Sequence, residues 1–218
     1  ASGAISVKQG FTFLAALLLI GACILLSLSN MAIILGFAVL PLIVLYPYMK
    51  RITWLCHFWL GLCLGLAPAG AWVAVAADVH GWAAITDLHW YPGIFFISLG
   101  VMFWIAAFDL NYARMDVEND RANGIHSFPA RFGEEATTRT SIQFTLLWFA
   151  CFAIANPIPE IWFLAAAGLM ALANIAVILA RERFANFQTT LFRVSMLTGW
   201  VLLLALMVSE SASNALGI

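Results

Sequence analysis

Long apolar runs alternate with short polar segments along the whole chain. Seven runs reach the roughly 17–25 residues that a helix needs to cross a bilayer. They lie at residues 11–29, 31–49, 54–77, 93–113, 140–156, 159–180 and 190–213. Backbone groups in lipid must be satisfied within closed structures, and the alternation typical of membrane barrels is absent, so the runs predict helices. The pattern predicts an all-α, multi-pass transmembrane helical bundle forming a single membrane-embedded domain over residues 1–218.

The composition supports a membrane protein. Hydrophobic residues make up 64% of the chain and charged residues 10%, whereas a soluble domain is about 25% charged. The net charge of −1 gives no electrostatic reason to expect nucleic acid as a partner. The four cysteines lie inside apolar runs without metal-site or disulfide spacing, and we interpret them as small packing residues.

Basic residues mark one side of the predicted bundle. The links fall alternately on two sides: residues 1–10, 50–53, 114–139 and 181–189 on one, and residues 29–30, 78–92, 157–158 and the C-terminal tail on the other. All ten basic residues lie on or next to the first side: Lys8, Lys50, Arg51, Arg114, Arg121, Arg131, Arg139, Arg181, Arg183 and Arg193. By the positive-inside rule this side faces the cytoplasm. We therefore expect any site among these links to face the cytoplasm. Our expectation for the location is an integral protein of a bacterial inner (plasma) membrane.

Three aspartates follow the fourth run in the stretch DLNYARMDVEND, residues 109–120. If the helix continues to residue 120, a turn of about 100° per residue places Asp109, Asp116 and Asp120 within about 40° of one another on one face. Tyr112 flanks the same stripe. Like charges on one helix face repel, so we expect a cation beside them.

Two interpretations account for that cation. In the first, the acids belong to a solvated helix end and pair with Arg114 and Arg121. In the second, they bind Mg²⁺, which prefers oxygen ligands and completes its shell with water and phosphate oxygens. An acidic stripe at the mouth of an apolar bundle suits a Mg²⁺–diphosphate substrate whose hydrocarbon tail lies among the helices.

Candidate anion-binding residues lie on the same side. Lys50 and Arg51 end the second run, and the segment GIHSFPARFG after the aspartates carries His126 and Arg131. Lysine and arginine side chains bind phosphate oxygens, and an imidazole donates to phosphate or accepts a proton. Each residue alone is equally well explained as a topology anchor or a packing residue of the loop.

The motif around the aspartates resembles that of a known family. The string Asp-x6-Asp-x3-Asp, with Tyr112 three residues after the first Asp, precedes Gly-Ile-His-Ser and Arg-Phe-Gly. It resembles the second aspartate-rich motif of the UbiA superfamily of intramembrane aromatic prenyltransferases. The segment Tyr46-Pro-Tyr-Met-Lys-Arg51 is similar to the end of that family's fourth helix. The likeness covers nearly the whole chain and is closest to the 4-hydroxybenzoate polyprenyltransferase branch, or to the related branch of the futalosine route to menaquinone.

The resemblance implies a reaction and a set of site residues. The family transfers a polyprenyl group from polyprenyl diphosphate to an aromatic acid, such as 4-hydroxybenzoate, in ubiquinone or menaquinone biosynthesis, and it depends on Mg²⁺. The partners implied are these two substrates and membrane lipid. By this likeness Mg²⁺ binds Asp109, Asp116 and Asp120, which act in catalysis with Tyr112. The substrate-binding residues would be Lys50, Arg51, Arg131 and His126.

One departure from the family pattern stands out. The family has nine transmembrane helices, and its first motif, N/D-D-x-x-D-x-x-x-D, does not occur in this sequence. The seven runs would then correspond to helices three to nine. We expect the chain to lack the N-terminal third, to hold half of a two-metal site, and to be inactive alone.

Two other classes of function stay open on the sequence alone. Intramembrane acids also mark ion pathways, but the remaining runs carry almost no ionisable group beyond His57 and Glu210, so a transporter or channel is less favoured. A non-catalytic membrane subunit is favoured only if the chain is complete as given. Mg²⁺-dependent binding of a polyprenyl diphosphate would favour the enzyme, and ion flux in vesicles the transporter.

Small residues recur in the third run. Gly61 and Gly65 stand four apart, on one helix face, and Gly70 follows. Small residues let helix backbones approach closely in membranes, so we expect Gly61 and Gly65 at a helix contact. Room for the prenyl chain is the alternative.

Overall fold

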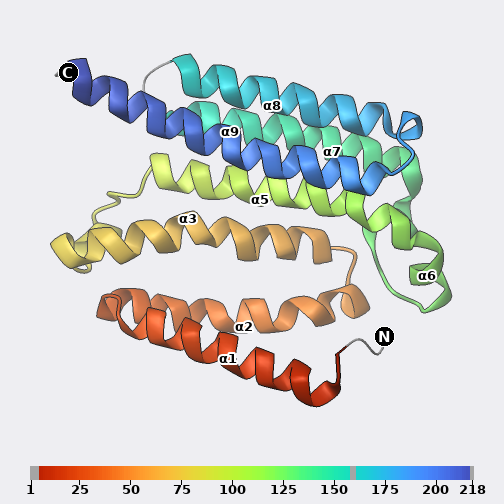
Figure 1. The fold of residues 1–218 in the computed structure, drawn as a ribbon, viewed down its shortest axis with the longest axis horizontal. Helices are drawn as coiled ribbons and strands as arrows, with labels where there is room; N and C mark the ends of the chain where they lie inside the picture. The colour runs from red at the N-terminus through yellow and green to blue at the C-terminus, as the bar shows by residue number, and fades with distance from the viewer. Residues whose placement is uncertain (1–4, 158–160, 217–218) are drawn as a thin grey trace. The chain divides into compact units, whose positions relative to one another are not determined.

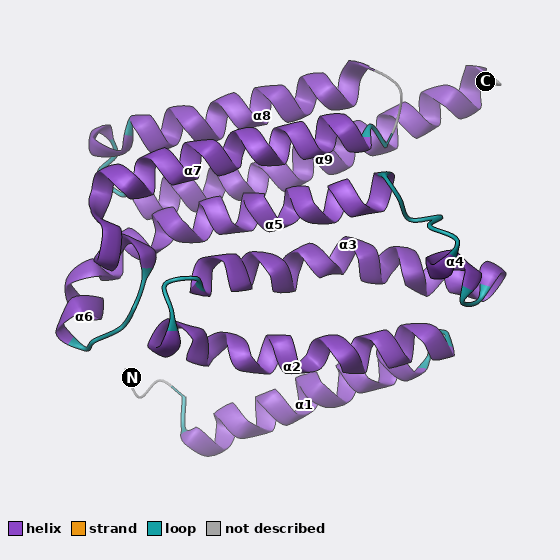
Figure 2. Cartoon of the chain, turned by 180° about the vertical axis from the view of Figure 1, so that it is seen from behind, coloured by secondary structure: helices purple, strands orange, loops and turns teal. Residues whose placement is uncertain are grey.

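The computed structural model describes residues 5–157 and 161–216, with side chains up to residue 208, and every regular element among them is a helix (Figures 1 and 2). Six of the described helices are long and apolar enough to cross a membrane. The all-α, multi-pass membrane fold is therefore confirmed. The helices are α1 (Val7–Leu26), α2 (Asn30–Ile52), α3 (Cys56–His80), α4 (Ala83–Thr86), α5 (Gly93–Tyr112), η1 (Ala113–Asp116), α6 (Val117–Ala122), α7 (Phe128–Ala155), α8 (Ile161–Leu179), η2 (Arg181–Arg183) and α9 (Phe187–Leu216).

The expected run at residues 140–156 falls on α7, which is not among those six. This helix begins twelve residues earlier than the apolar run, at Phe128, so its first turns carry charged residues. A kink lies within this charged beginning, at Gly133, whose φ of 81° is left-handed. Glycine takes this conformation without steric cost. The link expected around residues 157–159 lies largely outside the described residues.

The chain divides into two compact units, and the first comprises residues 1–41 and 70–89. Its small core is made by Met31, Val73 and Ala77. Helix α1 buries no residue, and all of its apolar side chains except the half-buried Leu25 are exposed. In a membrane this surface is solvated by lipid, which makes such an apolar exterior stable.

The second unit comprises residues 42–69 and 90–218. Helices α5, α7, α8 and α9 lie side by side in both views, and α7 packs along α5 and α8 (Figures 1 and 2). The main core is built around the fully buried Trp148. Buried polar pairs join the helices: Asn174 Nδ2 on α8 donates to Thr198 Oγ1 on α9 at 2.9 Å, and Trp104 Nε1 on α5 donates to Ser195 Oγ on α9 at 3.1 Å. Such bonds hold membrane helices together where no water competes.

The glycines of α3 confirm the predicted close packing. A Cβ atom on Gly61 would lie 2.4 Å from the backbone oxygen of Met102, and one on Gly65 would lie 2.7 Å from that of Ser98. Both oxygens belong to α5. The first half of α3 therefore approaches α5 more closely than any larger residue would allow, and this contact brings the start of α3 to the end of α5 that carries the aspartates. Gly70, by contrast, has nothing within 4 Å of such a Cβ.

Candidate functional site

The first aspartate is held by a histidine from another helix. Asp109 lies near the end of α5, and its Oδ2 is 2.7 Å from Nδ1 of His57, the second residue of α3. The other ring nitrogen, Nε2, accepts a hydrogen bond from the backbone N–H of Phe128 at 3.2 Å. The His57 side chain is fully buried, and that of Asp109 is 13% exposed. One imidazole thus joins the starts of α3 and α7 to the end of α5.

The chain after Asp109 does not continue as the straight helix that we expected. Helix α5 ends at Tyr112, one 3₁₀ turn covers Ala113–Asp116, and α6 follows. The Asn111 side chain donates to the Ala107 carbonyl, and side-chain bonds of this kind compete with regular helix geometry. The premise of one unbroken helix was therefore wrong, and the expected angle between Asp109 and the later aspartates stays a prediction.

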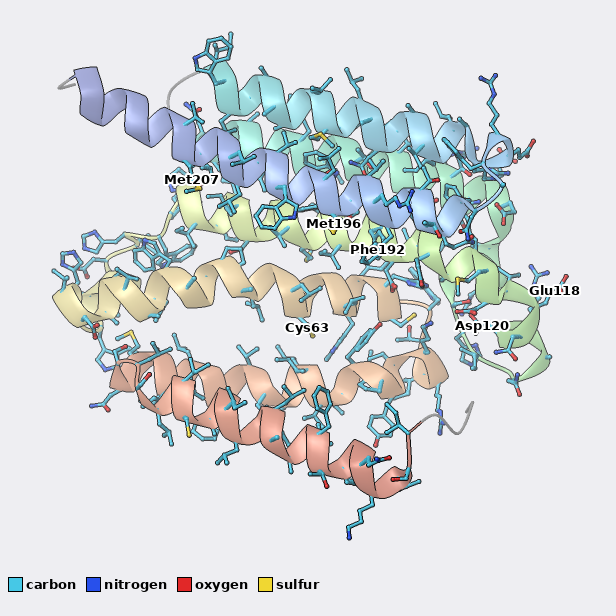
Figure 3. All side chains as sticks on the ribbon, viewed as in Figure 1. Cys63, Glu118, Asp120, Phe192, Met196 and Met207 are labelled. Carbon is cyan, nitrogen blue, oxygen red and sulfur yellow. The ribbon has the colours of Figure 1, made fainter. Side chains whose placement is uncertain are left out.

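The two later aspartates differ in exposure. Asp116 is half-buried at the junction of η1 and α6, and Asp120 is 3% exposed. Figure 3 shows Asp120 and Glu118 on α6, where Glu118 points away from the chain. The Oδ2 atom of Asp120 is buried and has no hydrogen-bond partner among the described residues. A buried carboxylate oxygen without a partner is costly, so Asp120 is short of a donor or cation.

The arginines expected to neutralise the acids are engaged elsewhere, so the pairing of Arg114 and Arg121 with the aspartates was wrong. Arg114 forms an ion pair with Glu134, and it donates to Asn111 and Thr138. Arg121 Nε donates to the carbonyl oxygen of Ala130. Within the described residues neither arginine forms an ion pair or a side-chain hydrogen bond with an aspartate of the stripe.

Polar links from three parts of the chain are tied together at one end of the second unit. The backbone N–H of His126 donates to the carbonyl oxygen of Lys50 at 2.8 Å. Thr138 Oγ1 accepts from Arg114 Nη2 at 2.8 Å and from Arg181 Nη1 at 3.0 Å. The charge pattern assigned these links to a single side of the membrane. In the structure, hydrogen bonds connect them at one end of the second unit.

The predicted anion-binding residues are accessible to a ligand in the structure. Arg51, His126 and Arg131 are exposed and Lys50 is half-buried. Within the described part of the chain the lysine and the two arginines form no ion pair. Arg131 lies over the ring of Phe132, 5.4 Å from its centroid. These cations therefore keep their charge free for an anionic ligand.

Tyr112, expected beside the acidic stripe, is 36% exposed and stacks on Phe108, with ring centroids 5.6 Å apart. No contact between its hydroxyl and an aspartate occurs among the described residues. Its place beside the substrates stays a prediction.

The aspartates do not form a ready-made metal cluster. No three Asp, Glu, His or Cys side chains stand close enough to hold a metal ion in the ranges that the structure describes. Their expected role as Mg²⁺ ligands stays a prediction. His57 is the functional candidate that the sequence reasoning missed: an ionisable residue in an apolar helix was the available signal, but its partner lies 52 residues away.

The sequence matches a family model over most of its length. The model of the UbiA prenyltransferase family matches residues 1–197. The chain belongs to this family. The predicted family is thereby confirmed.

Individual relatives of this UbiA family chain carry related names. It is 34% identical over 135 residues to the mitochondrial 4-hydroxybenzoate polyprenyltransferase of Schizosaccharomyces pombe, a match covering 62% of the chain and 35% of that protein. It is 28% identical to the 4-hydroxybenzoate octaprenyltransferase of Shewanella denitrificans, covering 92% of the chain and 64% of that protein. The chain thus spans between about a third and two thirds of the length of these relatives.

A solved structure shows the same fold as this UbiA family chain. The apo structure of a UbiA homolog from Aeropyrum pernix K1 superposes with a TM-score of 0.77 at 24% identity, covering 95% of the chain and 74% of that protein. This likeness supports the helical membrane fold.

Proposed function

We propose that this protein transfers a polyprenyl group from a polyprenyl diphosphate to an aromatic acid, 4-hydroxybenzoate or a related ring, in quinone biosynthesis, and that the transfer depends on Mg²⁺. Family membership and the names of the two relatives support the reaction class. The aspartates and the uncommitted cations beside them support a diphosphate as the donor. The membrane helices suit a long apolar donor chain.

The observation that carries the proposal is the buried, unpartnered Oδ2 of Asp120. Because Arg114 and Arg121 are engaged elsewhere, the carboxylate lacks the cation that its burial calls for. Mg²⁺ fits this need, since it binds through one or two carboxylates and takes its remaining ligands from water and phosphate. One or two of Asp109, Asp116 and Asp120 would bind it directly, and the others would bind it through its water ligands. A bound Mg²⁺ would neutralise charge developing on the leaving diphosphate.

The chain's own residues would do the rest of the chemistry. Lys50, Arg51 and Arg131 would bind the diphosphate oxygens, and His126 would donate a hydrogen bond to them. The allylic C–O bond breaks and the diphosphate leaves with its electron pair. The ring carbon ortho to the acceptor hydroxyl forms the new C–C bond and then loses its proton to the released diphosphate. The apolar helices keep water from the allylic cation.

We also propose that the site opens to the cytoplasm of a bacterial cell. The proposal rests on the positive-inside rule. It is supported by the hydrogen bonds that tie the basic links to one end of the second unit. A mitochondrial relative exists in Schizosaccharomyces pombe, so the matching compartment in a eukaryote would be the mitochondrion.

The test is a transfer assay on the gene product that carries this chain, purified into lipid nanodiscs. With geranylgeranyl diphosphate, 4-hydroxybenzoate and Mg²⁺, we expect a product heavier by one prenyl group. Chelation with EDTA should lower product formation by about 100-fold or more, and added Mg²⁺ should restore it, because several kcal/mol of charge stabilisation depend on the ion. Mass spectrometry measures the product. Ion flux from vesicles without any prenylated ring would overturn the proposal in favour of a transporter.

A further inference from the structure

A buried histidine lies between the predicted site and the start of α7. His57 has no exposed surface, and its two ring nitrogens contact Asp109 and the Phe128 backbone. A backbone N–H is only a donor, so Nε2 must be the accepting nitrogen. A neutral imidazole has one accepting and one donating nitrogen, so the proton sits on Nδ1 and is donated to Asp109 Oδ2.

The bond to Phe128 has a structural purpose. Phe128 is the first residue of α7, and the first four N–H groups of a helix have no partner inside it. Ser127, the N-cap residue, forms no side-chain cap bond. The His57 imidazole therefore does what an N-cap side chain usually does, from a different helix. It fixes the start of α7, which lies two residues after His126.

The bond to Asp109 leaves one carboxylate oxygen free. His57 is the sole hydrogen-bond partner of the Asp109 side chain in the described part of the chain. The hydrogen bond to Oδ2 restricts rotation of the carboxylate and so favours one direction for Oδ1. Carboxylates and histidines behind a metal ligand commonly orient it in this way, and their loss typically weakens metal binding by 10–100-fold.

We propose that His57 is a positioning residue that aligns Asp109 and the loop before α7 with each other, through an Nδ1–H imidazole. It touches neither substrate nor metal. Its effect on the aspartate rests on the proposed function, since it requires that Asp109 binds a cation. Its effect on the loop before α7 does not depend on the proposed function.

Two substitutions of His57 each remove one of its two hydrogen bonds and retain the other. In His57→Asn the amide nitrogen takes the position of Nδ1. This variant therefore retains the donor to Asp109 and loses the acceptor for the Phe128 N–H. The amide of His57→Gln reaches the place of Nε2, so it retains the acceptor and loses the donor. His80→Asn, at an exposed histidine, is the matched control. A histidine with a merely structural role would respond alike to both changes at residue 57.

The first readout is the ¹⁵N spectrum of histidine-labelled chain in nanodiscs, with the His57 signals assigned from their loss in the Asn variant. We expect protonated Nδ1 and unprotonated Nε2. The second readout is hydrogen exchange of the Phe128 amide. It should be about 10-fold or more faster in His57→Asn, because the bond that protects it is lost, and within about 3-fold of the parent chain in His57→Gln. The opposite tautomer, or equal exchange in the two variants, would overturn the proposal.

The third readout is the affinity for Mn²⁺ alone, measured by its electron spin resonance signal. In this readout His57→Gln is the affected variant. It should bind Mn²⁺ about 10–100-fold more weakly than the parent chain, whereas the affinity of His57→Asn should stay within about 3-fold of the parent. Equal loss in both variants would remove the role toward Asp109. If the parent chain binds no Mn²⁺, the proposed metal site fails, while the tautomer and the exchange rates still decide the role of His57.

Discussion

Asparagine in place of Asp120 should lower prenyl transfer by about 10²–10³-fold in the gene product that carries this chain. The same change at Asp116 should have a similar effect. In both variants the carboxylate that would help to neutralise the leaving diphosphate is replaced by a neutral amide of nearly the same shape. Turnover under saturating Mg²⁺ and both substrates is the measurement.

The folded protein should survive these changes. An unpaired buried amide costs less than an unpaired buried carboxylate, and Asp120 Oδ2 has no partner among the described residues. Without metal, the unfolding temperature of Asp120→Asn should equal or exceed that of the parent. With Mg²⁺, the parent alone should gain stability, because a ligand that binds only the folded state raises its stability.

A matched control stands between the two aspartates. Glu118 lies on the same short helix, carries the same charge and is exposed. Glu118→Gln changes the net charge by the same amount and should leave transfer within about 2-fold, since exposed charges contribute little in water. Unchanged transfer by Asp120→Asn, or equal loss by Glu118→Gln, would contradict the assignment of the acids.

Alanine at Gly61 or Gly65 should destabilise the protein by about 1–3 kcal/mol. The added Cβ would lie 2.4 Å from the Met102 oxygen or 2.7 Å from the Ser98 oxygen. Both obstacles are backbone atoms of α5, which cannot rotate aside as a side chain would. One of the two helices would have to move, and His57 and Asp109 would separate with it. Reversible unfolding in nanodiscs or mild detergent gives the free energy.

Gly70→Ala is the control on the same helix. Nothing lies within 4 Å of the added Cβ, and alanine is favoured over glycine in a helix by about 0.5–1 kcal/mol. This variant should therefore be as stable as the parent or more stable. If Gly61→Ala also proved neutral, the close approach of α3 and α5 would not be required for stability.

Much of the fold could be predicted because lipid imposes simple rules. Apolar length alone located six of the spanning helices, and the distribution of lysine and arginine grouped the polar links before any contact was known. The i,i+4 spacing of Gly61 and Gly65 indicated a helix contact, and the structure places α5 against both. These features depend on local sequence, which is why the sequence was sufficient.

The details of the site depend on contacts between distant residues, and these could not be predicted. Helix α5 ends at Tyr112. Just after this end, Arg114 forms an ion pair with Glu134, twenty positions away, and just before it the Asn111 side chain donates to the Ala107 carbonyl. The pairing of His57 with Asp109 spans 52 positions. Helix α7 starts at Phe128, ahead of its apolar run, and the N–H of Phe128 is bonded to His57, 71 positions away.

The kink at Gly133 divides α7 into two parts that can serve different purposes. The part before it carries Arg131 and follows His126, and the part after it holds Trp148 in the core. Other residues resist the left-handed backbone at this position, so a change of Gly133 would force the two parts into line. With glycine, the short leading segment takes a direction different from that of the part that packs in the core. The kink, and not the axis of the core helix, therefore sets the direction of the segment that carries Arg131.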